Sequence, residues 1–244
     1  SHLGLQDKMG EPTQINDHVL QIENEYYSLV RPKQVPLAGE TPSQALANRG
    51  VGYVELRAVD VNPYSDIGID EDTAGFLEVL ALYCLMQDSP ELYDQELEDI
   101  EKNQAEVVNR GRAPNAVIIE HKKQVPILKW MGQHLDHMQS LARVLNQTYA
   151  SRIYTQALET MKQRIHKVDE TLSAKVIQDT LSHKGTWSFG SEMANQHGQS
   201  YEAHVLKPDT IEYFKGLAQS SLQKQQQLEQ ECTQSFDEYL TAFR

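Results

Sequence analysis

Glu55 and Arg57 stand two positions apart in a segment, residues 51–63, that reads VGYVELRAVDVNP. If this segment is a strand, the two side chains leave the same face about 7 Å apart. A carboxylate placed there can bind Mg²⁺ while the guanidinium contacts a phosphate, and phosphoryl transfer uses both interactions. Structural ion pairs are commoner than catalytic ones, so the spacing alone favours an ordinary surface pair.

Two other pairs of residues have both a chemical and a structural interpretation. Tyr26 and Tyr27 are explained equally well as a tyrosine pair that covers the edge of a core. His134 and His137 lie one helical turn apart and could share a metal ion, but no third ligand stands near them in the sequence. We therefore interpret both histidines as residues of a helix surface. The sequence contains no P-loop, GxGxxG or GxSxG motif, so ATP chemistry would need another scaffold.

The elements that would position the carboxylate and the guanidinium lie in the first part of the chain. Residues 14–25 alternate in places and are rich in Ile, Val and Leu, which predicts a strand. Residues 26–36 contain two prolines and are predicted to form an exit loop. Residues 41–44, Thr-Pro-Ser-Gln, have the pattern of a helix start, and Gly50 stands where the following turn would be. A second strand is expected over residues 51–61.

Beyond residue 69 the apolar residues recur every three or four positions, which predicts helices. Residues 76–86 are apolar almost all round, so this helix should be packed on several sides. The Gln-rich run 219–234 is expected to form an exposed helix face or a frayed tail. We place a boundary near residue 68, between a strand-rich part, 1–68, and a helical part, 69–244. Further helical patterns cover residues 128–149, 153–168 and 172–181, and a last one opens at 211.

The composition excludes several classes of protein. The formal net charge is -13, from 35 acidic and 22 basic residues, which disfavours attraction to nucleic acid or to an anionic membrane surface. No run approaches the roughly 20 apolar residues that span a membrane, and no secretory leader pattern is visible. Cys84 and Cys232 form neither a disulfide framework nor a zinc-binding spacing. We therefore expect a soluble, cytoplasmic protein that binds neither nucleic acid nor membrane.

Several motifs follow one another within about the first 90 residues: QIN…VLQIENE-Y, RPK, GE-PS-AL, Y-E-R…D-NP and I-G-DE. In order and spacing they resemble the motifs of the proteobacterial glutamate–cysteine ligases, and a weaker likeness continues through the rest of the chain. The resemblance implies an α+β fold, with antiparallel strands of a glutamine-synthetase-like sheet followed by a mainly helical region. It also implies an ATP- and Mg²⁺-dependent ligation of L-glutamate to L-cysteine through an acyl phosphate, the first step of glutathione biosynthesis.

The same resemblance implies roles for three residues. Glu55 matches the family's metal-binding glutamate, and Arg57 matches the arginine that contacts the phosphate of ATP. Tyr27 matches the tyrosine that lines the cysteine site. Asn24 and Arg31 also fall at motif positions, without an implied role.

Members of that family are roughly twice as long as this chain, and the part absent here is their N-terminal half, which carries most of the metal-binding acids. The resemblance therefore implies a C-terminal half whose partner is the N-terminal half of the same enzyme, as a fragment or as one member of a split pair. Such a chain is expected to be inactive alone. Two other functions stay open: a non-catalytic helical interaction or regulatory fragment, and a related carboxylate–amine ligase with another acceptor.

Overall fold

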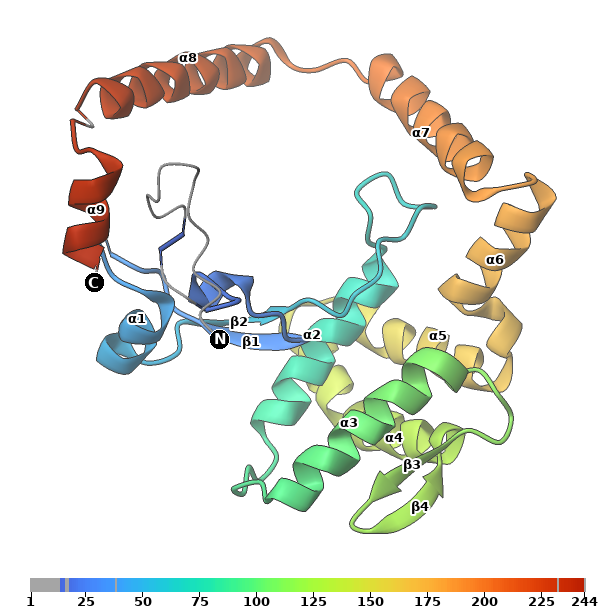
Figure 1. Ribbon diagram of the computed structural model, residues 1–244. Helices are drawn as coiled ribbons and strands as arrows, with labels where there is room; N and C mark the ends of the chain where they lie inside the picture. The colour runs from blue at the N-terminus through green and yellow to red at the C-terminus, as the bar shows by residue number, and fades with distance from the viewer. Residues whose placement is uncertain (1–13, 16–17, 38, 232, 244) are drawn as a thin grey trace. The chain divides into compact units, whose positions relative to one another are not determined.

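The protein is described from a computed structural model, in which contacts divide the chain into two units (Figure 1). Unit 1 comprises residues 1–60 and 204–244, and unit 2 comprises residues 61–203. We describe each unit by itself. The boundary at residue 68 stays a prediction. The structure describes residues 14–15, 18–37, 39–231 and 233–243.

Unit 1 contains a two-stranded antiparallel sheet in which β1 (Val30–Lys33) pairs with β2 (Tyr53–Leu56). Between the strands the chain forms α1 (Pro42–Arg49), which begins as the sequence predicts. The Thr41 side chain accepts a hydrogen bond from the backbone of Gln44, and the Gln44 side chain accepts one from the backbone of Thr41. This capping box satisfies two backbone donors that the helix itself leaves open. The expected helix over residues 42–49 is therefore confirmed.

The strand predicted over residues 14–25 is wrong for the described residues of that range. They form bends and a short 3₁₀ helix, η1 (Glu23–Glu25). A strand is stable only when a neighbour satisfies its backbone, whereas here the Gln21 N–H donates to the Glu25 carboxylate at 2.9 Å. The apolar residues of this segment indicate hydrophobicity but do not supply a pairing partner.

The first strand instead lies inside the predicted exit loop, at β1, which contains Pro32. The N–H of Arg57 donates to the carbonyl of Leu29, so the pair formed by these two residues is hydrogen-bonded. Because bonded and non-bonded pairs alternate in an antiparallel ladder, Pro32 and Val54 form a non-bonded pair. The ladder requires no N–H from Pro32, and a proline is tolerated at such a position of an edge strand.

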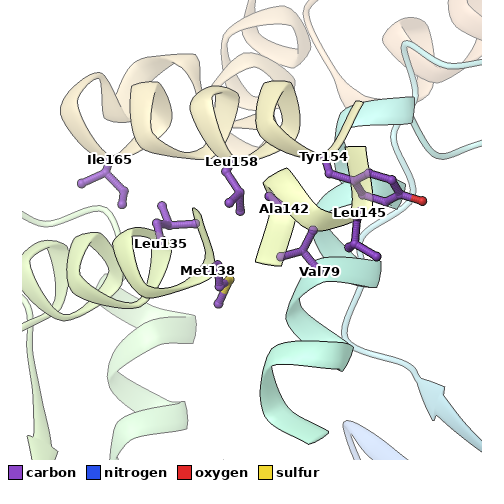
Figure 2. Close-up of a cluster of buried hydrophobic side chains, with 8 residues drawn as sticks. All are labelled: Val79, Leu135, Met138, Ala142, Leu145, Tyr154, Leu158 and Ile165. Atoms are coloured by element: carbon purple, nitrogen blue, oxygen red, sulfur yellow. The ribbon is translucent and has the colours of Figure 1, made fainter. Parts of the chain in front are cut away.

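Unit 2 is a helical bundle with one hairpin. Its core lies between α2 (Glu71–Leu85), α4 (Ile127–Thr148) and α5 (Ile153–His166). At Gly75 the backbones of α2 and α5 come so close that an added Cβ would lie 3.3 Å from Ile153 Cγ1. The α2 helix packs against α5 and α4 through its buried residues Gly75 and Val79, whereas Leu85 and Met86 are 80% and 72% exposed, so the expected packing on several sides is confirmed only in part. Figure 2 shows the buried cluster that these helices form: Val79, Leu135, Met138, Ala142, Leu145, Tyr154, Leu158 and Ile165.

A hairpin that the sequence patterns did not reveal connects α3 (Asp94–Arg110) to α4 (Figure 1). Its strands, β3 (Val117–Glu120) and β4 (Lys123–Pro126), are antiparallel. The two residues of the turn, His121 and Lys122, have φ values of 47° and 64°. Such turns usually contain Asn-Gly or Asp-Gly, so this one carries none of the usual sequence signal.

The remaining elements are helical. Unit 2 continues with η2 (Val168–Glu170), α6 (Leu172–Ser182) and α7 (Thr186–Ala203), and unit 1 ends with α8 (Pro208–Glu231) and α9 (Phe236–Phe243). The described part of the Gln-rich run, residues 219–231, forms an exposed helix as predicted. None of the described helices combines the length and the apolar character that a membrane crossing requires. The expected α+β class, with antiparallel strands near the N-terminus and helices after them, is confirmed.

Candidate functional site

The register of the β1–β2 ladder gathers charged side chains on one face of unit 1. Arg31 pairs directly with Glu55, and Lys33 pairs with Tyr53. Opposite residues of an antiparallel pair point to the same face, and so do residues two apart on one strand. Arg31, Lys33 and Glu55 therefore share a face, together with Arg57, which directly follows β2.

The carboxylate of Glu55 lies between two cations. Its Oε1 is 3.5 Å from Arg57 Nε, and its Oε2 is 3.7 Å from Lys33 Nζ. Arg31 stands across the ladder and donates from Nη1 to the carbonyl of Tyr26 at 3.2 Å. Two cationic side chains thus contact one carboxylate and a third shares its face, and this face attracts anions in a chain whose net charge is -13. The sequence patterns did not single out Lys33, because its segment was predicted to be a loop.

One oxygen of Glu55 has unused bonding capacity. The side chain is 35% exposed as a whole, but its Oε2 atom is buried and has no hydrogen-bond partner. A buried carboxylate oxygen normally accepts a hydrogen bond or binds a cation. Oε2 lies 3.7 Å from Lys33 Nζ but accepts no hydrogen bond, so it retains capacity for a further ligand.

Tyr27 belongs to the same surface as Arg57. The guanidinium carbon of Arg57 lies 5.5 Å from the centroid of the Tyr27 ring, within the range of a cation–π interaction. Tyr27 is 63% exposed, so no core encloses its contact with Arg57. The structure thus brings together the three residues that the sequence motifs selected, Tyr27, Glu55 and Arg57.

A cavity of about 400 Å³ adjoins this charged face. Its lining includes Arg31, Lys33 and Tyr53 from the ladder and Asn24 from η1. Asn24 and Arg31, the two motif residues without an implied role, therefore both face this cavity. Glu55, Arg57 and Tyr27 are outside its lining.

The wall of the cavity is held together by a contact between η1 and α1. The Glu23 carboxylate accepts hydrogen bonds from the backbone N–H of Ser43 at 2.9 Å and from its hydroxyl at 2.7 Å. These hydrogen bonds, with a smaller contribution from the charge of Arg31, lower the pKa of Glu23. An ionised Glu23 at the first turn of α1 also interacts favourably with the helix dipole.

The described residues supply only part of a metal site. No group of three or more His, Cys, Asp and Glu side chains in the described ranges is placed to hold a metal ion. Mg²⁺ in nucleotide sites, however, is often held by one or two carboxylates together with substrate phosphates and water. Glu55, whose Oε2 accepts no hydrogen bond, fits one such ligand.

The two histidines considered from the sequence lie in unit 2 and have structural partners. His134 is half-buried, not a surface residue; its Nδ1 is 3.1 Å from the hydroxyl of Tyr83, and its ring packs on Trp130. Burial lowers the pKa of His134. His137 is exposed, and its ring centroid lies 6.1 Å from that of His134. These contacts support a packing role for His134.

Unit 2 has a cavity of its own, with a volume of about 580 Å³. Its lining comes from α2, α4 and α5 and is mostly apolar, with Leu80, Leu128 and Met131 among its residues and Arg112 at a polar position. This composition lacks the cluster of charges found on the ladder of unit 1. We therefore place the candidate site for phosphate chemistry in unit 1.

Comparisons with known proteins agree with the motifs. A family model described as glutamate–cysteine ligase matches residues 1–107. The glutamate–cysteine ligase of Azotobacter vinelandii is 37% identical over 237 residues, which are 96% of this chain and 44% of that protein. That of Saccharophagus degradans is 36% identical over 243 residues, which are 99% of this chain and 46% of that protein. The chain thus spans about half the length of the curated relatives it matches.

The fold matches as well. A crystal structure of glutamate–cysteine ligase from Francisella tularensis in complex with AMP covers 99% of this chain with a TM-score of 0.88 and 31% sequence identity. This chain covers 48% of that protein. Sequence and fold together identify the chain as a relative of the proteobacterial glutamate–cysteine ligases along nearly its whole length, consistent with their C-terminal half.

Proposed function

We propose that this chain provides part of the active site of an ATP-dependent glutamate–cysteine ligase, the enzyme of the first step of glutathione biosynthesis. The relatives carry this name, and the matched Francisella tularensis structure was solved with AMP. The observation that carries the proposal is the position of Glu55 between Lys33 and Arg57, with an Oε2 atom that accepts no hydrogen bond. A cationic face with one available carboxylate suits a nucleotide triphosphate that arrives with its metal.

In the first step, an oxygen of the glutamate γ-carboxylate attacks the γ-phosphorus of ATP, and the bond to ADP breaks. Negative charge on the transferring group is stabilised by the guanidinium of Arg57 and the ammonium of Lys33. Arg57 contacts Oε1 of Glu55 and Lys33 contacts Oε2, so the two cations flank the same carboxylate. The products of this step are ADP and a γ-glutamyl phosphate.

Mg²⁺, when bound, neutralises phosphate charge, and Glu55 is the residue of this chain that would hold it. Without the metal, the carboxylate of Glu55 and the phosphates of ATP would repel each other. The metal therefore accounts for an acidic residue at the centre of an anion-binding face.

In the second step, the amine of cysteine attacks the acyl carbon, phosphate leaves with its bonding electrons, and the nitrogen loses a proton. Tyr27 contributes the aromatic surface beside Arg57 against which the cysteine is held. Its exposure leaves room for a substrate on the ring. The cysteine specificity then depends on Tyr27 together with residues outside this chain.

The partner of this chain in the active site is the part of the ligase that it lacks. The described residues contain no group of three or more His, Cys, Asp and Glu side chains that could hold the metal without a partner. We therefore expect the 244-residue chain to be inactive alone and to form a complete site with the N-terminal half of such an enzyme, in the cytoplasm.

The test uses a fusion protein. The complementary segment, defined as the part of the Azotobacter vinelandii ligase that the match does not cover, is joined upstream of Ser1. ADP release is measured with Mg-ATP, glutamate and cysteine, and each amino acid is omitted in turn. We expect rapid release only when both are present and none from the chain alone.

Other outcomes separate the remaining functions. Release that is equally fast with another amino acid in place of cysteine would indicate a ligase with a different acceptor. A folded fusion protein that releases no ADP under any condition would contradict a catalytic role and favour a non-catalytic interaction fragment.

A further inference from the structure

Helix α8 is long but unsupported. It spans 24 residues, all within the described part of the chain, and none of them is buried. No other described helix or strand forms an extensive contact with it. Helices in water draw most of their stability from packing an apolar face, so a helix of this kind is expected to have a partner.

The sequence of α8 contains such an apolar face. At about 100° per residue, α8 has an apolar arc of about 140° with a polar face opposite; Gln225 and Glu229 interrupt the arc near the end of the helix, and Tyr213 lies outside it. Five large apolar side chains make up this arc. The exposed fractions of these side chains run from 39% to 60%. We call them the α8 stripe: Ile211, Phe214, Leu217, Leu222 and Leu228.

Charges border the stripe. Lys215 lies at one edge of the apolar arc and Lys224 at the other, and neither forms an ion pair with a residue in the described ranges. The opposite face carries glutamine, including Gln219 and Gln223. The surface that fits α8 therefore has an apolar centre opposite residues 211–222, acidic residues opposite the two lysines, and a polar or basic group opposite Glu229.

The length of the relatives indicates the occupant. The Francisella tularensis ligase matches 99% of this chain, so nearly all of the chain, α8 included, has a counterpart there. This chain covers only 48% of that protein, which leaves more than half of it to meet an exposed helix. A second copy is a poorer partner, because two chains of net charge -13 repel each other.

We propose that the α8 stripe is the docking surface for the complementary segment, the part of the ligase that this chain lacks. The proposal rests on the proposed function, because the complementary segment is the partner that the proposed function requires. Apolar burial on α8 holds the two parts together, while the charged face of unit 1 serves the chemistry. These are separate surfaces, so they can be disrupted separately.

The experiment mixes the full 244-residue chain with the separately produced complementary segment of the Azotobacter vinelandii ligase. Sedimentation velocity measures association for the wild-type chain, for the double variant Phe214→Glu/Leu222→Glu and for the control Gln219→Glu/Gln223→Glu. The control adds the same charge to the opposite face of the same helix. Both variants should fold, because every substituted side chain is exposed, and circular dichroism checks this.

We expect the wild-type chain and the control to bind the segment, and the stripe variant to bind at least about a hundredfold more weakly, because two large apolar side chains lose their burial. No binding by the wild-type chain, or equal binding by all three, would overturn the proposal. So would self-association that only the stripe variant abolishes, since the occupant would then be a second copy.

The fusion protein separates this proposal from the proposed function. If the two parts associate through the stripe but the fusion protein releases no ADP, the docking surface stands and the function fails. If the fusion protein is active but the stripe variant associates normally, the function stands and the docking surface fails.

Discussion

Replacing Glu55 by Gln should change ATP binding in opposite directions with and without Mg²⁺. The carboxylate contacts Arg57 and Lys33, so it weakens their attraction for phosphate when no metal is present. The side chain is 35% exposed, so solvent screens its interactions in part and the value for water is a lower bound. A charge pair about 6 Å apart in that medium interacts by about 0.7 kcal/mol, so a multiply charged phosphate group is repelled by about 1 kcal/mol.

Without Mg²⁺, the Glu55→Gln chain should consequently bind ATP about fivefold more tightly than the wild-type chain. With Mg²⁺, the wild-type chain should gain affinity through the metal, whereas the variant should gain little. An NMR titration of the 244-residue chain is suitable because it detects millimolar affinities. The control is Glu98→Gln on α3, which removes an equal charge from a carboxylate 3.5 Å from Lys102.

The reasoning would be refuted by either of two results. One is a Glu55→Gln chain that binds metal-free ATP no more tightly than the wild-type chain. The other is an equal gain in affinity on adding Mg²⁺ to both proteins, which would show that the metal does not contact Glu55.

Two further predictions concern stability. Leu158, on α5, is completely buried in the cluster with residues of α2 and α4, so Leu158→Ala should lower the free energy of unfolding, measured in urea, by about 2–5 kcal/mol. Leu181→Ala, at a 74% exposed position, should change it by less than about 0.5 kcal/mol. Equal losses would contradict the observed core. Hydrogen bonds from Arg49 lower the pKa of Glu40 from 4.5 to about 2. Because the pKa is lower in the folded chain, ionised Glu40 stabilises α1 above pH 4.5, and this contribution is lost as the pH falls towards 2. An NMR titration that gives an ordinary carboxyl pKa for Glu40 would contradict the ion pair with Arg49.

The sequence predicted those elements whose signals are local. The helix after Thr41 was recognised because its capping box and following glycine lie within ten residues of one another. The apolar residues of α4 and α5 likewise recur every three or four positions, because one face of each helix packs against the core. Features that depend on a distant partner were harder to find. Apolar residues before Glu25 suggested a strand, but the backbone N–H of Gln21 donates a hydrogen bond to the side chain of Glu25 in the same segment.

The candidate site shows the same division. Glu55 and Arg57 were found because they stand two positions apart in the strand predicted over residues 51–61, although β2 ends at Leu56, and Tyr27 was found because its motif resembles a known family. Lys33 was missed because Pro32 suggested a loop, whereas the ladder places that proline at a pair that needs no N–H. Once β1 is assigned to residues 30–33, its alternation predicts that Arg31 and Lys33 share the face of Glu55.

The most direct test of the central claim is the turnover of the fusion protein with Arg57→Lys. This substitution keeps the charge but removes the planar pair of donors that can bind a phosphate in bidentate fashion. ADP release is measured with saturating glutamate and cysteine, and Arg143→Lys, at an exposed position of α4, is the control. We predict that kcat falls at least about tenfold for Arg57→Lys and stays unchanged for Arg143→Lys. An unchanged kcat in both variants would show that the charged face of unit 1 takes no part in phosphoryl transfer.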